Sequence, residues 1–339
     1  MNRPPDQDLT ILDIAREAGV SPATVSRVLN GTAGVRADKA ERVRAVIARH
    51  NYRPNPFARG LLGQQTGVFG VLVPQLEDEF YGKIVTGVER ELRREGMHLL
   101  CSLGHDDPGE EAQALELFRE RQVDGLILLA DQIDDAAILR QMEQRVPLVL
   151  INRLIPELEP HCLRLDNVRG GYDATRHLLD LGHRRIAHIA GPLERPGARE
   201  RLDGYRTALR EAGLEPLEWL VVESEFSEDG GYLACKRLLG RGEFTALFAG
   251  NDQLALGAIA ALREAGLEVP ATVSVIGFDD RTLARFCFPA LTTLHYPMLE
   301  MGARAARHLL ALLRGEGPPA LSRLRPELVV RSSTSAPGS

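Results

Sequence analysis

A short run near the start of the chain has residue types and spacing suited to contacting DNA. If Ser21 to Asn30 forms a helix, the apolar side chains of Val25, Val28 and Leu29 share one face. The opposite face then presents small polar groups and one arginine: Ala23, Thr24, Ser26, Arg27 and Asn30. Such a surface fits the major groove, where arginine pairs with guanine and short side chains allow close approach.

A second group of polar and aromatic residues follows short apolar runs in the rest of the chain. Aromatic rings stack on the C–H faces of a sugar, while arginine, asparagine and aspartate bond neighbouring hydroxyls. Their recurrence after apolar runs predicts a site for a small polyhydroxylated ligand. The group comprises Phe80, Tyr81, Asn152, Arg153, Asp166, Arg195, Arg199, Arg201, Phe226, Asn251, Asp252, Asp279 and Asp280.

Three helices are expected to position the first set. Thr10 can cap the first helix, with Asp13 as the partner in a capping-box-like pair, and Gly19 supplies the turn. Ser21 and Pro22 suit the cap and first position of the second helix. Apolar periodicity predicts a third helix from about Ala37 to His50, which would close a small core.

From Val68 onward, apolar β-branched runs alternate with amphipathic helical stretches. This alternation predicts parallel sheets with right-handed crossovers. The expected strands are 68–73, 99–102, 125–129, 148–151, 163–166, 186–190, 220–222, 246–249, 273–277, 292–295 and 328–330. The clearest expected helices are 80–94, 171–181, 202–212, 254–265 and 299–313.

About eleven strands are many for one open sheet, and the irregular segment 152–161 interrupts the alternation near its middle. The expected fold class is therefore α/β: a three-helix headpiece followed by two doubly wound lobes. In such sheets a ligand lies beyond the carboxyl ends of the strands.

Charge divides the chain into a basic head and an acidic body. The formal net charge is −6. Residues 1–65 hold ten Lys and Arg against six Asp and Glu, whereas the remainder holds 31 against 41. The basic residues 1–65 are therefore expected to attract DNA phosphates, whereas the acidic remainder of the chain is expected to repel them.

Composition excludes several classes of protein. With 339 residues, 44% hydrophobic and 26% charged, the chain matches a soluble protein of two or three domains. No apolar run approaches the roughly 18 residues needed to cross a bilayer. The first eight residues lack the apolar core of a signal peptide. A cytoplasmic protein at the nucleoid is expected, with no membrane association.

Catalytic and metal-binding motifs are missing from the sequence. There is no Gly-x-Gly-x-x-Gly loop after a strand, no Walker-type loop and no nucleophile elbow, so no enzyme is expected. Cys101, Cys162, Cys235 and Cys287 are too scattered to predict zinc ligation or a disulfide framework. We expect no metal and no cofactor, and structural roles for His183 and His188.

Several long motifs resemble the LacI/GalR (lactose repressor) family of bacterial transcription regulators. They are DIAREAGVSPATVSRVLN from Asp13, NYRPNPFAR from Asn51, GHRRIAHIAGP from Gly182, AGNDQLALG from Ala249 and VIGFDD from Val275. The resemblance covers nearly the whole chain. It implies a headpiece over residues 1–54, a hinge helix over 55–66 and an effector-binding core over 67–335. The first lobe would span about 67–166 with 296–325, and the second about 167–295 with 326–335.

The resemblance also assigns residues that contact DNA. Pro22, Ala23 and Arg27 fall where the family reads bases, and Arg27 is expected on guanine. Leu61 falls at the leucine wedge of the minor groove. The remaining expected contacts, mostly to phosphate, are Thr10, Ser21, Thr24, Ser26, Asn30, Asn55 and Arg59.

In the core, the resemblance assigns the effector to Phe80, Tyr81, Arg153, Arg195, Arg201, Phe226, Asn251 and Asp279. The expected effector is a sugar or sugar derivative, and the extra arginines at 153 and 195 hint at an anionic one. The chain carries no C-terminal leucine heptads, so a homodimer on a pseudo-palindromic double-stranded operator is expected. The expected function is repression controlled by the effector. Two alternatives remain: a sugar-binding protein that does not bind DNA, and a regulator that senses a nucleobase or nucleoside.

Overall fold

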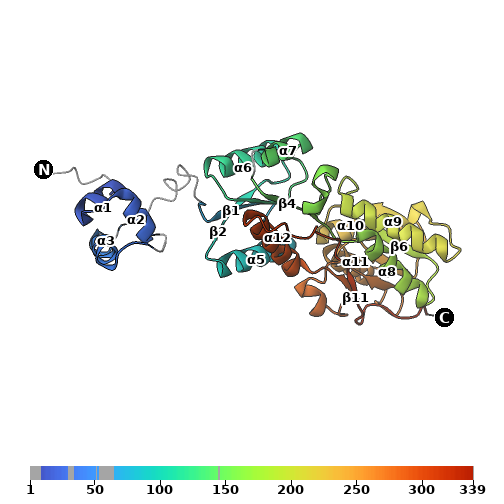
Figure 1. The fold of residues 1–339 in the computed structure, drawn as a ribbon. Coiled ribbons are helices and arrows are strands. Elements are labelled where there is room, and N and C mark those ends of the chain that lie inside the picture. Colours follow the sequence, from blue (N-terminus) through green and yellow to red (C-terminus); the bar gives the residue numbers. More distant parts are fainter. Residues whose placement is uncertain (1–8, 30–33, 51, 53–64, 144–145, 339) are drawn as a thin grey trace. The chain divides into compact units, whose positions relative to one another are not determined.

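The chain forms two units, residues 1–66 and 67–339. The computed structural model describes residues 9–29, 34–50, 52, 65–143 and 146–338. The described part of the first unit is helical, and the second unit alternates strands and helices (Figure 1).

The predicted headpiece helices are confirmed. They are α1 (Ile11–Ala18), α2 (Pro22–Leu29) and α3 (Ala37–His50). The backbone N–H and the hydroxyl of Thr10 donate to the Asp13 carboxylate, at 3.1 and 2.7 Å. Gly19 ends α1 with φ +64°, a conformation that glycine adopts without strain.

A small apolar core joins the three helices. Its fully or nearly fully buried members are Ile14, Ala15, Ala18, Val25, Val43 and Val46. Glu17 on α1 also accepts from Arg49 at 2.8 Å and pairs with His50 at 2.7 Å, both on α3. The packing leaves the opposite face of α2 available, with Ala23 and Arg27 exposed.

The first lobe of the core is a five-stranded parallel sheet in the order β2-β1-β3-β4-β5. Its strands are β1 (Val68–Val73), β2 (His98–Leu103), β3 (Leu126–Leu128), β4 (Leu148–Ile151) and β5 (Cys162–Leu163). Alternate residues of β1 face opposite sides, so Val71 packs in one cluster and Leu72 in another. The helices are α5 (Glu79–Arg94), α6 (Pro108–Glu120), α7 (Asp135–Glu143) and α12 (Met298–Leu313).

The second lobe is a four-stranded parallel sheet in the order β7-β6-β8-β9. Its strands are β6 (Ile186–Ala190), β7 (Val221–Glu223), β8 (Ala246–Ala249) and β9 (Ser274–Ile276). Its helices are α8 (Asn167–Asp180), α9 (Pro196–Glu211), α10 (Glu228–Leu239) and α11 (Asp252–Glu264). Helices cover both faces of each sheet (Figure 1), which confirms the predicted doubly wound fold.

The chain passes between the lobes more than once. It leaves the first sheet after β5, returns before α12, and passes again before β11 (Glu327–Val329), which pairs antiparallel with β10 (Thr293–His295). A bridge between Leu165 and Leu324 ties two of these passing segments together. Three 3₁₀ turns complete the described elements: η1 (Pro156–His161), η2 (Glu218–Leu220) and η3 (Thr282–Arg285).

Two helices of the second lobe begin earlier than predicted. Helix α8 begins at Asn167 instead of Gly171, and α9 begins at Pro196 instead of Leu202. Their first turns are polar or glycine-rich, so apolar periodicity becomes visible only further along. Strand β5 was also predicted wrongly, since 164–166 lies beyond its end.

Close packing of α8 on α9 depends on glycine. A Cβ atom at Gly171 would lie 2.1 Å from the carbonyl oxygen of Arg201, and one at Gly204 would lie 2.1 Å from that of Val168. The two backbones therefore meet directly, at the residue that carries the Arg201 side chain. The expected hinge contacts Asn55, Arg59 and Leu61 lie outside the described residues, as does Asn30.

Candidate functional site

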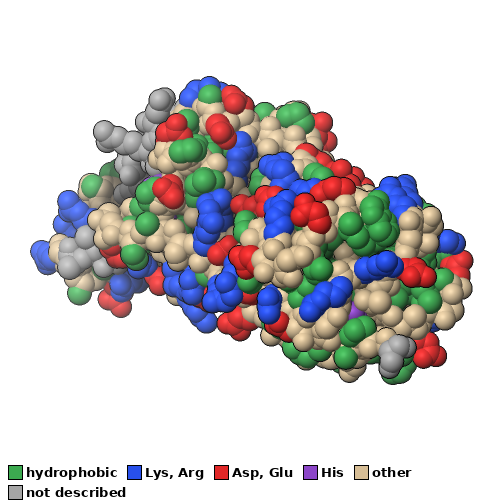
Figure 2. Space-filling view, turned by 90° about the vertical axis from the view of Figure 1, so that its right-hand side faces the viewer, with side chains coloured by type: hydrophobic (Ala, Val, Ile, Leu, Met, Phe, Trp, Pro, Cys, Tyr) green, Lys and Arg blue, Asp and Glu red, His purple; other side chains and the backbone are tan. Residues whose placement is uncertain are grey.

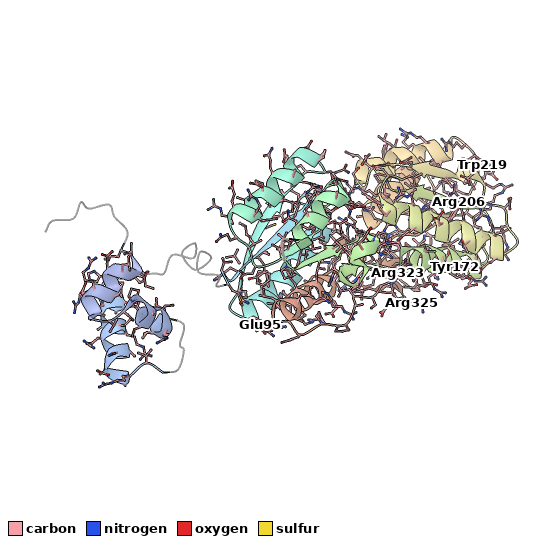
Figure 3. The ribbon with its side chains drawn as sticks, turned by 45° about the horizontal axis from the view of Figure 1, so that its top comes forward. Glu95, Tyr172, Arg206, Trp219, Arg323 and Arg325 are labelled. Atoms are coloured by element: carbon pink, nitrogen blue, oxygen red, sulfur yellow. The ribbon has the colours of Figure 1, made fainter. Side chains whose placement is uncertain are left out.

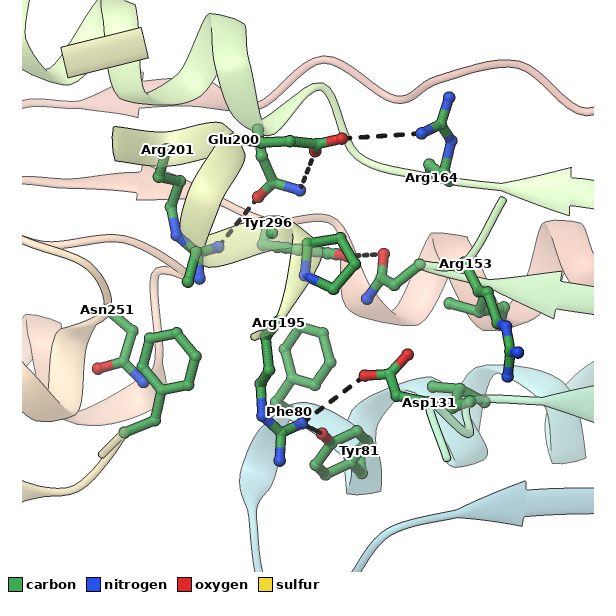
Figure 4. A pocket seen from close by; sticks show the side chains of 18 of the residues that line it. Phe80, Tyr81, Asp131, Arg153, Arg164, Arg195, Glu200, Arg201, Asn251 and Tyr296 are labelled. Atoms are coloured by element: carbon green, nitrogen blue, oxygen red, sulfur yellow. Dashed lines mark hydrogen bonds and ion pairs between the residues drawn. The ribbon is translucent and has the colours of Figure 1, made fainter. Parts of the chain in front are cut away.

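One cavity lies beyond the carboxyl ends of strands from both sheets of the core (Figure 4). It has a volume of about 920 Å³, within the usual range for small-molecule sites. All eight residues expected to bind an effector line it: Phe80, Tyr81, Arg153, Arg195, Arg201, Phe226, Asn251 and Asp279. The structure thus brings together side chains that are up to 199 positions apart in the sequence.

Arg201 is the most deeply buried cation of this wall. Its guanidinium lies over the rings of Phe226 and Phe278, with 5.3 and 4.8 Å from Cζ to the ring centroids. Nη1 donates to Oδ1 of Asn167 at 2.9 Å, and Nε has no hydrogen-bond partner within the described residues. Burial lowers the pKa of Arg201, while the nearby carboxylate of Asp279 opposes that shift. The side chain is therefore oriented and still has hydrogen bonds to give.

Asp279 supplies a carboxylate next to this guanidinium. Its backbone has φ +109°, which is rare for a residue with a side chain, and its N–H donates to the carbonyl of Leu294 at 2.8 Å. Burial raises the pKa of Asp279 to about 6, against the opposing charges of Arg281 and Arg201. A strained backbone that holds a buried acid in a cavity is typical of a functional position.

Asn251 presents an amide from the start of α11. Its Oδ1 accepts from the backbone N–H of Leu254 at 2.9 Å and so caps the helix. Its amide nitrogen makes only a long 3.5 Å contact to Gln253, which leaves it able to donate to a ligand.

Aromatic rings form opposite parts of the cavity wall. Phe80 meets Tyr81 and Tyr296 edge to face, with centroids 5.1 and 5.0 Å apart. Phe226 lies over Gly191, where a Cβ atom would come within 2.0 Å of the ring. Rings on both lobes therefore border the space that a ligand would fill.

The two arginines that hinted at an anionic ligand are already engaged. Arg153 donates to the carbonyls of Ala130 and Ile133, at 3.0 and 2.5 Å, and pairs with Asp135 at 2.5 Å. Arg195 pairs with Asp106 at 2.7 Å. The cavity lining holds eight carboxylates and five guanidiniums, so it offers no excess of positive charge. Acidic and basic side chains are likewise interspersed on the face of the molecule seen in Figure 2.

Other residues expected near the ligand serve the protein itself. Asp166 caps α8 by accepting from the N–H of Arg169 at 3.1 Å. Arg199 donates to the carbonyls of Leu193 and Glu194, at 2.6 and 2.8 Å. Neither lines the cavity, and nor do Asp252 and Asp280, which are buried in hydrogen-bond networks.

Several lining residues were missed by the sequence analysis. Asp78 and Asp106 follow β1 and β2, so the rule that found Phe80 could have found them. Asn167 and Glu200 lie on helices and carry no such signal. Tyr296 donates to Asn152 at 2.6 Å, which links β10 to the end of β4.

The two histidines of the GHRRIAH motif are structural, as expected. His188 lies between the rings of Tyr205 and Phe248, and burial lowers its pKa to about 3. His183 bonds the hydroxyls of Thr245 and Ser274, at 2.9 and 3.1 Å. Among the described residues, no three His, Cys, Asp or Glu side chains are placed to hold a metal ion.

In the first unit, α2 presents its predicted outer face. Ser21 caps the helix, accepting from the N–H of Thr24 at 3.3 Å, and its hydroxyl lies 3.0 Å from that of Thr24. Pro22, Ala23 and Arg27 are exposed along the same helix. Its start and its outer face thus expose short side chains and one guanidinium.

Known proteins share both units of this chain. Residues 10–55 match the model of "Bacterial regulatory proteins, lacI family", and residues 175–334 match a periplasmic binding protein-like domain. The chain is 40% identical over 332 residues to the transcriptional regulator GalR of Escherichia coli strain K12, covering 97% of this chain and 96% of GalR. The chain belongs to the lacI family of bacterial regulatory proteins.

Further relatives support this membership of the lacI family. The chain is 37% identical over 330 residues to the repressor PurR of Haemophilus influenzae strain Rd, covering 96% of this chain and 98% of PurR. A crystal structure of the lac repressor dimer bound to operator and the anti-inducer ONPF matches with a TM-score of 0.86. It shares 31% identity, and the match covers 97% of this chain and 100% of that one.

Family membership settles the general function. The protein is a DNA-binding transcriptional regulator with an effector-binding core, and its named relatives are regulators, not enzymes. No helix in the described parts of the chain is long and apolar enough to span a membrane.

Proposed function

We propose that this lacI-family regulator represses transcription in the cytoplasm, and that a neutral polyhydroxylated ligand, a sugar or sugar derivative, controls its affinity for DNA. The observation that carries this proposal is the group formed by Arg201, Asn251 and Asp279 beside the ring of Phe226. It offers an aromatic face, two kinds of donor and a carboxylate acceptor. Adjacent hydroxyls of a sugar ring can accept from these donors and donate to the carboxylate, while the C–H face of the ring stacks on the aromatic side chain.

Charge favours a neutral ligand over an anionic one. Arg153 and Arg195 already bind carboxylates, so an anion would have to displace Asp135 or Asp106. Displacement of Asp106 leaves a partly buried carboxylate without its partner, which is costly, whereas Asp135 is exposed and its displacement costs less. Arg201 is bonded by a neutral amide, but the nearby carboxylate of Asp279 already offsets part of its charge.

The headpiece is proposed to read the operator through α2. Arg27 would pair with guanine, while Pro22 and Ala23 would supply shape and apolar contact. Ser21, Thr24 and Ser26, with Thr10 at the start of α1, would hold phosphates and fix the docking. Asn30, Asn55, Arg59 and Leu61 remain predictions from the sequence.

A homodimer is proposed, with exposed apolar residues near η3 at its interface. Phe286 and Phe288 are 78% and 86% exposed, and Leu283 is 57% exposed. Large apolar side chains clustered on a surface mark an interaction site. A two-fold dimer would place two copies of α2 on the half-sites of a pseudo-palindromic operator.

The proposal is tested in two steps with the full-length protein. Genomic DNA fragments are first selected by binding, and the operator is confirmed by gel shift. Replacing Arg27 by alanine should then cost about 1–3 kcal/mol of discrimination at the guanine it contacts. Failure to retain any fragment, with and without metabolite extract, would refute sequence-specific DNA binding.

The second step identifies the effector. A thermal-shift panel of sugars, sugar phosphates, sugar acids, nucleobases and nucleosides is followed by calorimetric titration of each hit. A neutral sugar is expected to bind most tightly and to change operator affinity. Preference for a nucleobase would instead support the alternative regulator, and preference for a sugar phosphate would refute the charge argument.

A further inference from the structure

One arginine connects the two lobes at the cavity. Arg195 precedes α9 in the second lobe, yet its guanidinium contacts residues of the first (Figure 4). Nη2 donates to Oδ2 of Asp106 at 2.7 Å, and Nη1 lies 3.4 Å from the hydroxyl of Tyr81. Asp131 lies a little further away, with 3.9 Å between Oδ2 and Nη1. The guanidinium therefore spans the cleft.

The loop that carries Asp106 is held in a strained conformation. His105 and Asp106 both have positive φ, at 49° and 55°, although neither is glycine. Asp107 then caps α6 by accepting from Gly109 and Glu110, at 2.8 and 2.9 Å. Two consecutive left-handed residues persist only where the surroundings enforce them. The strained backbone is therefore that of the aspartate whose side chain contacts the second lobe.

Glu111 fixes this loop against the one that carries Asp131. Its side chain is fully buried, and Oε2 accepts from the backbone N–H groups of Gln132 and Ile133, at 3.0 and 2.8 Å. A Cβ atom at Gly104 would lie 2.6 Å from Cγ of Glu111, so the two loops pack directly on this side chain. Both carboxylates that face Arg195 are therefore positioned before any ligand arrives.

Negative charge exceeds positive charge around the guanidinium of Arg195. Asp106 and Asp131 both face the guanidinium of Arg195, and burial raises the pKa of Asp131 against the opposing charges of Arg195 and Arg153. Oδ1 of Asp106 is buried and has no hydrogen-bond partner within the described residues. Arg195 consequently has little attraction left for an incoming anion.

We propose that Asp106 and Arg195 form a latch that holds the two lobes together and, by occupying the guanidinium, excludes anionic ligands from the cavity. The exclusion of anions rests on the proposed function, because it concerns the effector of the same cavity. Asp106 is then a specificity-determining and positioning residue, and Arg195 acts in closure without binding an anionic group of the effector. Asp78–Arg281 and Glu79–Thr282 also join the lobes, so loss of the latch should shift the closed population and not abolish it.

Closure is tested without effector or DNA, on the full-length protein. Spin labels are attached to cysteines placed at the exposed positions Glu110 and Asp229, one in each lobe, with Cys101 and Cys287 replaced by serine. Electron–electron double resonance then gives the distance distribution. Asp106→Asn and Arg195→Gln should each lower the ratio of closed to open molecules at least threefold, and the double variant should do no more than either alone.

A matched control removes an ion pair within one lobe. Arg206 on α9 pairs bidentately with Glu218 at 2.7 and 3.1 Å, and it lies at the outer side of the second lobe (Figure 3). Arg206→Gln should leave the distances unchanged. Exchange of the charges, Asp106→Arg with Arg195→Asp, should restore part of the closed population.

Calorimetric titration with inorganic phosphate tests the exclusion of anions. Asp106→Asn should bind phosphate at least fivefold more tightly than the wild type, and the added change Arg195→Gln should remove that gain. Unchanged distances, or an unchanged phosphate affinity in Asp106→Asn, would overturn the proposal. Neither result would affect the gel-shift test of operator binding, so failure of the latch is distinguishable from failure of the proposed function.

Discussion

The guanidinium of Arg201 stacks on the ring of Phe226, with 5.3 Å between Cζ and the ring centroid. A second ring, that of Phe278, lies 4.8 Å away. The planar cation is thus held by aromatic faces and one amide, that of Asn167, and it forms no ion pair with the residues that the structure describes. This arrangement keeps its donors available at the cavity wall. It also makes the site dependent on the shape of arginine as well as on its charge.

Arg201→Lys should therefore weaken effector binding although the charge is kept. Lysine lacks the planar surface and the fork of donors, so loss of two or more bonds should cost about 1.5–3 kcal/mol, roughly 10- to 150-fold in affinity. Calorimetry with the effector found by screening measures the loss. Arg206→Lys on the same helix is the matched control and should bind normally. Operator binding without effector should persist in both variants, and normal effector affinity in Arg201→Lys would contradict the site.

Effector binding should weaken in acid through Asp279. Burial raises the pKa of this carboxyl to about 6, so it is mostly ionised at pH 7.5 and mostly protonated at pH 5. If the carboxylate accepts ligand hydroxyls, affinity should fall about tenfold between these pH values. Titrations in Asp279→Asn, which are expected to be weak, should show no such step. An affinity that rises toward pH 5 would contradict this role.

Asp252 should govern stability more than binding. The two oxygens of its carboxyl group accept from the hydroxyl of Thr293 at 2.6 Å and from the N–H of Arg281 at 2.7 Å. Asp252→Ala leaves both donors unpaired and should cost about 1–3 kcal/mol in the free energy of unfolding. Asp252→Asn keeps an acceptor and should cost much less.

The raised pKa of Asp252 also predicts how the free energy of unfolding changes with pH. Burial, followed by the charge of Asp279, raises the pKa of Asp252 to about 8. Between pH 4 and 8 the folded protein therefore holds a proton that the unfolded chain releases, so stability falls as pH rises through this window. Urea unfolding at pH 5 and pH 8.5 should show this fall in the wild type and less of it in Asp252→Asn. Identical pH profiles would contradict the assignment.

Phe286→Asp should disrupt the proposed dimer. A charged carboxylate on an apolar interface is unfavourable, so sedimentation velocity should show monomer at concentrations where the wild type is dimeric. Operator affinity should fall with it, because one headpiece then binds one half-site. Leu217→Asp, which changes another exposed apolar residue, is the control and should leave the dimer intact. A fully dimeric Phe286→Asp would contradict this interface.

The sequence predicted most where local chemistry decides the structure. The buried apolar runs of β1, β4, β6 and β8 were predicted with the bounds observed. Most of the residues predicted after such strands met in one cavity because the carboxyl ends of parallel strands share an edge, whereas Arg199 and Asp252 do not line it. The early start of α9 was missed because its first turn carries little apolar character.

Pairing across the cleft could not be predicted in the same way. In the sequence, Arg195 was interpreted as a hint of an anionic ligand. Only the fold brings Asp106, which is 89 positions away, into an ion pair with it. Asn167 lies on a helix whose inward face depends on the packing of α8 against α9. Such relationships are set by tertiary geometry and leave no periodic signal in the chain.

The central claim is that occupancy of the cavity and affinity for the operator are linked. Fluorescence anisotropy with a labelled operator, measured with and without saturating effector, tests it most directly. The two operator affinities should differ by about 5- to 150-fold, and effector affinity should change by the same factor when operator is added. Equal operator affinities at saturating effector would contradict the account.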